Sequence, residues 1–179
     1  MPNRRVIRRP RPAAHPADRT IAISKAGLRK CALIHYLLGL LMLFKLTAFN
    51  VEKVNAAIQE LLIPEPDAWE WVWIASLLVT AFAIQDCDKG DIASLRYYMI
   101  FMVVLGIFPL IWGGTIWFSD AWAYLFAYDA PFHIVYWNGY PAGIIWYHFI
   151  MFTLLVHGFF LYFSFKLVNA WEARNNHDE

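Results

Sequence analysis

The sequence predicts an all-α, polytopic transmembrane protein: a four-helix bundle with an interfacial aromatic loop. Three observations support this fold class. Of its 179 residues 60% are hydrophobic, against about 45–50% in an average soluble protein. The apolar residues are concentrated in long blocks, and the basic residues fall almost entirely between alternate blocks. The length is that of one domain.

The first segment, residues 1–30, is a basic, proline-rich arm that holds nine of the fifteen Lys and Arg residues. Prolines interrupt helical hydrogen bonding and like charges repel, so we predict an extended arm. The first apolar run begins only after Lys30 and no small-residue cleavage site follows it. We therefore expect no cleaved signal peptide.

The first two spans are predicted at residues 31–49 and 69–85. A helix of nineteen residues is about 28 Å long, close to the roughly 30 Å hydrocarbon thickness of a bilayer. Residues 50–68 connect the two spans and are acidic, and their apolar positions over 50–62 predict a short amphipathic helix at the surface. The second span opens with three tryptophans, which are typical of a membrane boundary.

The third and fourth spans are predicted at residues 95–118 and 143–167. A polar reversal at residues 86–91 leads into the third span, where Pro109 predicts a bend. Residues 119–142 contain no Lys or Arg but many aromatic side chains. This composition is typical of a segment that lies in the membrane interface.

The sequence therefore predicts three parts of the chain: an arm at 1–30, a four-span domain at 31–168 and a short tail at 169–179. With a cytosolic N-terminus, thirteen basic residues lie on the cytosolic side and only Lys53 on the other, with Lys45 inside the first span. The excess of Lys and Arg on the cytosolic side predicts that both termini are cytosolic.

We predict structural roles for the two cysteines and for several glycines. Cys31 and Cys87 are too few for a disulfide framework and lie at predicted cytosolic helix ends, so we expect them to stay reduced. Gly39 and the pair Gly113-Gly114 would allow neighbouring helices to approach closely.

Lys45 is a charged residue inside a span, and such residues need a physical explanation. It lies near the luminal end of the first span. We favour a side chain that extends to the luminal headgroups. The alternative is a buried ion pair with a luminal acid, Asp120 or Asp129.

Three histidines lie in the first and fourth spans. His148 and His157 are nine residues apart, which places them on opposite faces of a helix, so they cannot share a metal. A pair of His35 with His157 leaves open a bis-histidyl haem anchor of an oxidoreductase. We favour neutral histidines hydrogen-bonded within the bundle, and expect no cofactor and no metal.

Catalytic motifs are missing from the sequence. It has no glycine-rich phosphate loop, no HExxH, no GxSxG and no pair of carboxylates within a span. The sequence thus predicts a protein that is not an enzyme.

The chain resembles the Jagunal family in the order and spacing of its polar and aromatic positions between residues 31 and about 172. The resemblance rests on His35 with Lys45 ten residues later, Trp69-Glu70-Trp71, the run from Gly106 to Gly113, and the run from His157 to Leu167 with Trp171. It implies a four-span membrane protein of the endoplasmic reticulum without catalytic activity. It also implies roles in organising that membrane and in early secretory vesicle traffic, including contact with coat components.

The two ends depart from the family pattern. Residues 1–30 differ from the family's N-terminal segment, and the tail lacks a basic dilysine signal. We interpret Arg4-Arg5 as a candidate di-arginine retrieval signal in its place. The expected partners are the lipid bilayer and, through the arm, coat or other membrane proteins; we expect no nucleic acid.

An alternative is an accessory structural subunit of a large membrane complex, such as a respiratory complex of the mitochondrial inner membrane. The first thirty residues carry nine basic residues and one acid, Asp18, the charge balance of a transit peptide. Their prolines fit an amphipathic transit helix poorly.

Overall fold

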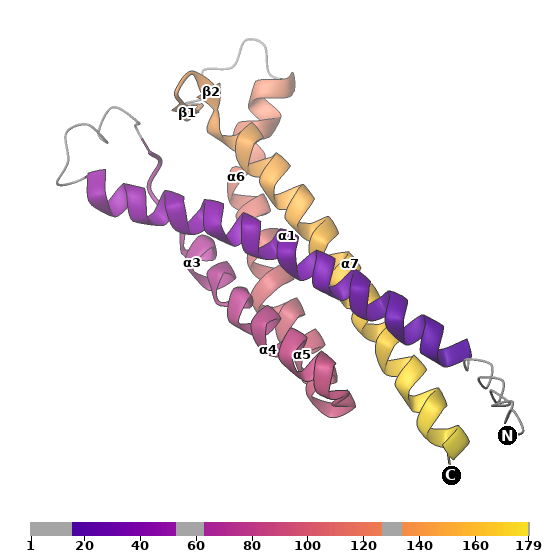
Figure 1. Ribbon diagram of the computed structural model, residues 1–179. Helices are drawn as coiled ribbons and strands as arrows, with labels where there is room; N and C mark the ends of the chain where they lie inside the picture. Colours follow the sequence, from indigo (N-terminus) through magenta and orange to yellow (C-terminus); the bar gives the residue numbers. More distant parts are fainter. Residues whose placement is uncertain (1–15, 53–62, 127–133, 179) are drawn as a thin grey trace, which may run out of the picture.

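The computed structural model describes residues 16–52, 63–126 and 134–178, and helices dominate these ranges (Figure 1). The elements are α1 (Pro16–Glu52), α3 (Ala68–Ile74), α4 (Ser76–Lys89), α5 (Ile92–Phe101), the π-helix η1 (Met102–Ile107), α6 (Phe108–Phe126), β1 (Tyr136–Trp137), β2 (Tyr140–Pro141) and α7 (Ala142–Asp178). The predicted all-α, polytopic fold class is confirmed.

Within the described ranges, four helical stretches are long and apolar enough to cross a membrane: Ala17–Val51, Ala68–Lys89, Ile92–Phe126 and Ala142–Asn176. The second stretch consists of α3 and α4, and the third consists of α5, η1 and α6. α1 and α7 each have 37 residues, or about 55 Å. Each is longer than the roughly 40–45 Å of a whole bilayer with its headgroups.

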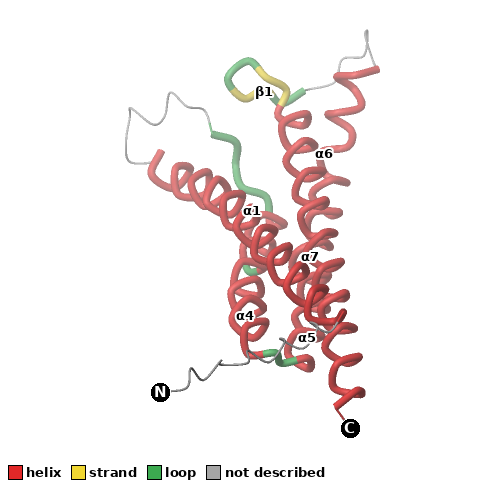
Figure 2. Tube along the Cα trace, turned by 45° about the vertical axis from the view of Figure 1, so that its right-hand side comes forward, coloured by secondary structure: helices red, strands yellow, loops and turns green. Residues whose placement is uncertain are grey.

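α1 and α7 pack along each other toward the N-terminus of α1 and the C-terminus of α7, and diverge toward the opposite end (Figures 1 and 2). The start of α1 is thereby part of the bundle: Ile21, Ser24 and Leu28 are buried. The Lys25 Nζ lies 5.4 Å from the centroid of the Trp171 ring on α7.

The prediction of an extended arm is wrong for residues 16–30, which form the beginning of α1. Pro16 is the first helical residue, where a missing N–H breaks no hydrogen bond. No further proline follows before residue 31. The interior contacts with α7 then stabilise this basic segment as helix. Residues 1–15 lie outside the described part of the chain.

The segment predicted as an interfacial loop, residues 119–142, is partly helical. α6 continues to Phe126, so the third helix passes the predicted end at 118. Residues 127–133 lie outside the described part of the chain, as do residues 53–62, which hold most of the predicted surface helix. Asn138 and Gly139, with φ of 47° and 82°, form the two-residue turn of the β1–β2 hairpin.

The reversal predicted at residues 86–91 joins α4 to α5. Gly90 adopts φ 78° as the C-cap of α4, and the Asp91 side chain accepts a hydrogen bond of 3.1 Å from the Ser94 amide as the N-cap of α5. At the same end of the bundle Arg29 of α1 pairs with Asp88 at 2.6 Å. Arg96 of α5 pairs with Glu172 of α7.

The helix is irregular just before Pro109, where the sequence predicts a bend. η1 is a π-helix, and the Phe108 amide after it bonds to the Val103 carbonyl, five residues back. Such widened turns let a helix continue where a hydrogen bond is missing, and Pro109 has no amide hydrogen. The bend itself stays a prediction.

Candidate functional site

Lys45 and Glu70 form an ion pair inside the bundle. The Lys45 Nζ on α1 donates to both carboxylate oxygens of Glu70 on α3, each at 2.7 Å. The two side chains are 6% and 0% exposed. Glu70 is held in place from its own segment too, because its Oε1 accepts a hydrogen bond from the Asp67 amide at 3.3 Å.

The prediction that Lys45 extends to the luminal headgroups is therefore wrong. The ion-pair alternative is right in kind, but the partner is Glu70 and not Asp120; Asp129 lies outside the described residues. The physical reason is that α3 packs against α1 inside the bundle, where Glu70 meets Lys45. Glu70 lies between two tryptophans in the sequence, and this acid inside an apolar boundary was the signal that sequence reasoning missed.

Tryptophans surround this ion pair. The Lys45 Nζ lies 4.8 Å from the centroid of the Trp146 ring, and Trp146 meets Trp69 edge to face at 5.6 Å. The indole nitrogens of Trp69 and Trp117 both donate to the Oδ2 of Asp67, at 3.2 and 3.0 Å. Asp67 thus connects the start of α3 to α6.

His35 of α1 and His157 of α7 also lie together, and His35 precedes Lys45 by ten residues, about 15 Å along the helix. Their ring centroids are 4.6 Å apart and the planes are nearly perpendicular. The Trp73 indole donates to the His157 Nε2 at 3.0 Å, so this nitrogen is an unprotonated acceptor. The His35 ring nitrogens contact the hydroxyls of Thr80 and Ser76 at 2.8 and 3.1 Å.

Hydrogen-bonded histidines within the bundle, the interpretation favoured from the sequence, are what the structure shows. The Ser76 hydroxyl donates to the Trp73 carbonyl at 2.6 Å, so it accepts from the His35 Nε2. A bis-histidyl haem needs iron and a macrocycle between the two rings, but these rings contact each other directly. His148 is exposed and bonds the Ile144 carbonyl at 2.8 Å, on the opposite face from His157 as predicted.

The second span carries the side chains that join these groups. Asp67, Glu70, Trp73, Ser76 and Thr80 recur every three or four residues, which places them on one helical face. We call these five residues the polar face of the second span. It bonds to Lys45 and His35 on α1 and to His157 on α7. Sequence reasoning found those three partners but missed the polar face, although its spacing is visible in the sequence.

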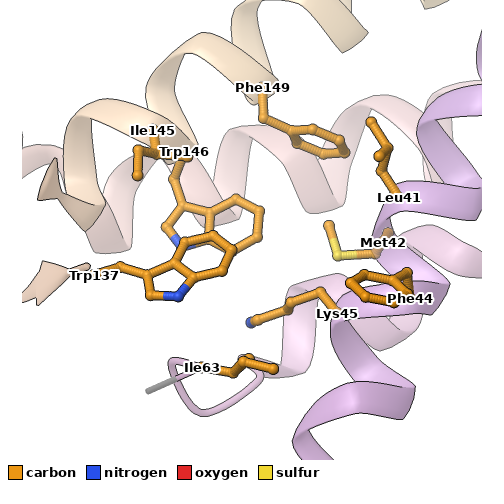
Figure 3. Close-up of a pocket in the computed structure, with 9 residues that line it drawn as sticks. All are labelled: Leu41, Met42, Phe44, Lys45, Ile63, Trp137, Ile145, Trp146 and Phe149. Carbon is orange, nitrogen blue, oxygen red and sulfur yellow. The ribbon is translucent and has the colours of Figure 1, made fainter. Parts of the chain in front are cut away.

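A cavity of about 310 Å³ lies beside Lys45, between α1 and α7 (Figure 3). Its walls are apolar, with Met42 and Phe44 from α1 and Trp146 and Phe149 from α7.

Most polar groups of this site bond to one another, whereas the buried His157 Nδ1 and Trp146 Nε1 make no hydrogen bond within the described residues. Lys45 is neutralised by Glu70, and both histidines are held by hydrogen bonds. Among the residues that the structure describes, no group of three or more His, Cys, Asp or Glu side chains is arranged to hold a metal ion. The arrangement can therefore fix the relative positions of α1, the second span and α7. Arg4 and Arg5 lie outside the described residues.

Comparison with known proteins finds relatives of this chain by sequence. The family described as "Jagunal, ER re-organisation during oogenesis" matches residues 11–175. Protein jagunal of Drosophila melanogaster is 35% identical over 160 residues, covering 85% of this chain and 81% of that protein. A jagunal homolog of Caenorhabditis elegans is 29% identical, covering 76% of this chain and 75% of that protein. Protein jagunal homolog 1 of Homo sapiens is 24% identical, covering 82% and 76%. This chain belongs to the Jagunal family.

Proposed function

We propose that this chain is a non-enzymatic, multi-pass protein of the endoplasmic reticulum membrane that organises this membrane and takes part in early secretory vesicle traffic. The observation that carries the proposal is the family match over residues 11–175, with its description of endoplasmic reticulum re-organisation during oogenesis.

The interior of the bundle supports a structural role. Lys45, Glu70, His35 and His157 contact each other or the polar face of the second span. Groups that are bonded to each other inside the bundle are not presented to a substrate. Interactions with other molecules would then use the outer surfaces, where lipid meets the helices and charged residues gather at one end.

We place the charged end, which carries the Arg29–Asp88 and Arg96–Glu172 pairs, in the cytosol with both termini. The excess of basic residues near this end supports the assignment. The bilayer and coat or other membrane proteins would be the partners, the latter through the basic N-terminal arm.

The proposed function can be tested by asking whether this chain replaces a relative in cells that lack it. Drosophila melanogaster oocytes that lack their own protein jagunal would receive this chain with a small tag. We expect the tagged chain in the endoplasmic reticulum and its arrangement restored, together with export of secretory cargo. A chain that reaches the endoplasmic reticulum at normal levels but restores neither property contradicts the proposal.

Retrieval through Arg4-Arg5 is a separate proposal with its own test. Replacing both residues by alanine removes the candidate signal, and we expect the protein to escape to later secretory compartments. Replacing Arg8 and Arg9 by alanine is the matched control, because it removes the same charge from the arm. Unchanged retention of the Arg4→Ala/Arg5→Ala protein, measured by colocalisation, overturns this proposal.

A further inference from the structure

Two lysines lie on the outer side of the line of contact between α1 and α7, which we call the seam. A Cβ atom at Gly27 of α1 would lie 2.6 Å from the Phe163 ring of α7, so the two helices touch there. Lys30 follows Gly27 by three residues, and Lys166 follows Phe163 by three residues. Three residues turn a side chain by about 300° around the helix. Because α1 begins where α7 ends (Figure 1), these equal turns bring both lysines, which are exposed, to the same flank of the seam.

The two side chains extend toward each other along the seam. The side chains of a helix tilt toward its N-terminus, and these directions are opposite in antiparallel helices. Lys30 therefore extends toward the level of Lys166, and Lys166 toward the level of Lys30, over an offset of about 9 Å between their positions on the helices. The Lys166 Nζ has this direction, because it lies 3.5 Å from the hydroxyl of Tyr162, one turn nearer the start of α7.

The acids near this end of the bundle do not balance these two charges. Neither Lys30 nor Lys166 forms an ion pair with a residue in the described ranges. Asp18 of α1 is twelve residues from Lys30, about 18 Å along the helix. Three other acids are bonded to other cations, in the pairs Asp86–Lys89, Asp88–Arg29 and Glu172–Arg96. Like charges repel each other, so an anion between the two lysines would be stabilising.

Toward the opposite end of the bundle the same flank of the seam is apolar. At about 100° per residue, the flank continues with exposed hydrophobic side chains from both helices: Ile34, Leu37, Leu41, Phe159, Leu155 and Phe152. No Asp, Glu, Lys or Arg occurs at residues 31–44 of α1 or 142–165 of α7. Lys30 and Lys166 are therefore the first charges at the boundary of each apolar stretch. A ligand that fits this flank combines a negative headgroup with hydrocarbon chains.

We propose that Lys30 and Lys166 bind the headgroup of one anionic phospholipid. The phosphate lies between the two ammonium groups, next to the Tyr162 hydroxyl, and the acyl chains lie along the apolar part of the flank. A zwitterionic lipid fits less well, because its own amine neutralises the phosphate. A free phosphate would match the cations but leave the apolar part of the flank without a partner. The site is independent of the role proposed above, because it rests on the contacts and charges of α1 and α7.

Photo-crosslinking in vesicles tests the site. The purified full-length chain is reconstituted in phosphatidylcholine vesicles that contain a trace of phosphatidylinositol or of phosphatidylcholine, each with a diazirine near the start of one acyl chain. After illumination, mass spectrometry maps the crosslinked residues. We expect phosphatidylinositol to label Ile34 and Phe159, on the flank beside the lysines, several-fold more than phosphatidylcholine does. Phe108 and Ile111, exposed on α6, should be labelled equally by the two lipids.

Three double variants separate this site from general attraction between charges. Lys30→Gln/Lys166→Gln removes both cations, so the preference for phosphatidylinositol on the flank should disappear. Lys30→Arg/Lys166→Arg keeps the two charges and should keep the preference. Arg19→Gln/Arg174→Gln is the matched control, because these exposed residues also lie one on each helix and form no ion pair within the described ranges. The preference should persist in this control.

Equal labelling of the flank by the two lipids overturns the proposal. A preference that survives Lys30→Gln/Lys166→Gln also overturns it, as does one that Arg19→Gln/Arg174→Gln abolishes as well. In a parallel reconstitution inorganic phosphate is added at constant ionic strength, and the preference should remain. Its loss would assign the two lysines to a free anion and overturn the assignment to a lipid.

Discussion

At the scale of single residues, the Lys45–Glu70 pair leads to the clearest energetic expectation. Lys45→Met leaves the Glu70 carboxylate buried, with a hydrogen bond from the Asp67 amide. Breaking a buried ion pair by removing one partner costs about 3–5 kcal/mol. We expect a loss of this size in the free energy of unfolding in detergent, followed by thermal melting.

The double variant Lys45→Met/Glu70→Gln removes both charges and should be more stable than Lys45→Met alone. Lys166→Met is the control, since Lys166 is exposed and near the Tyr162 hydroxyl. A Lys45→Met protein that melts like the Lys166→Met protein would show that the ion pair contributes nothing.

A second prediction concerns Trp73 and its neighbour Trp71. Trp73→Phe keeps an aromatic ring but leaves the His157 Nε2 without its donor. An unsatisfied buried acceptor costs about 1–3 kcal/mol, and the melting temperature should fall accordingly. Trp71 is 52% exposed, so Trp71→Phe should change stability by less than about 0.5 kcal/mol. Equal effects of the two substitutions would contradict the role of the Trp73–His157 bond.

Lys45, His35 and His157 could be selected from the sequence because a polar residue inside an apolar span is conspicuous. The residues that pair with them could not be identified from the sequence. Glu70 pairs with Lys45 only because α3 approaches α1 within the membrane-spanning part of the bundle, and hydropathy contains no information on that approach. The same holds for the contact between His35 and His157, which two helices far apart in the sequence create.

At the scale of helices, close packing at Gly113 leads to a prediction about its substitution by alanine. The neighbouring Gly114 provides the control. A Cβ atom at Gly113 would lie 2.6 Å from the Trp69 ring, whereas one at Gly114 would meet nothing within 4 Å. The Trp69 ring cannot move freely, because it is fully buried and bonded to Asp67.

Gly113→Ala should therefore lower stability by about 1–3 kcal/mol, as is usual for overpacking. Gly114→Ala should be neutral or stabilising by up to about 1 kcal/mol, since alanine favours helix over glycine. Thermal melting of the two variants in the same detergent measures the difference. A Gly114→Ala protein less stable than the Gly113→Ala protein would contradict the predicted contact between α3 and α6.

The N-cap of α5 predicts a dependence of stability on pH. Hydrogen bonds from the Ser94 amide and then from its hydroxyl lower the pKa of Asp91 below its usual 3.8. A lowered pKa in the folded state means stability that is present above that usual value and is lost as the pH falls through the lowered one. The Asp91→Asn protein keeps a capping acceptor that does not titrate in this range.

We therefore expect the wild type to melt above Asp91→Asn at neutral pH, with a difference that shrinks as the pH falls below about 4. Glu65→Gln, at an exposed acid of the connection before α3, controls for general effects of charge removal. A difference between the wild type and Asp91→Asn that is constant over this pH range would contradict the prediction.

Helix boundaries were the part of the fold that the sequence predicted least well. Hydropathy locates the residues that fit a membrane, and it therefore ends each segment near the membrane boundary. α1 and α7 do not end there, because Ile21 and Leu28 of α1 pack within the bundle core that also includes Val168 and Trp171 of α7. That packing depends on two helices meeting, which a single segment does not reveal.

At the scale of the whole molecule, the structure places two sets of features at opposite ends. The Arg29–Asp88 and Arg96–Glu172 pairs mark one end, where α7 also finishes. The β1–β2 hairpin marks the other (Figure 2). The orientation that we propose puts the first end in the cytosol and the hairpin in the lumen.

Cysteine labelling in sealed microsomes tests this orientation. Cys31 and Cys87 are 7% and 1% exposed, so the wild type should react little with a membrane-impermeant maleimide. Asn175→Cys, at an exposed position near the end of α7, should react in intact microsomes. Tyr140→Cys, at a residue 68% exposed in the hairpin, should react only after the membrane is permeabilised with detergent. The reverse pattern would invert the proposed topology, and labelling of both variants in intact microsomes would place the two ends on one side, against the four crossings.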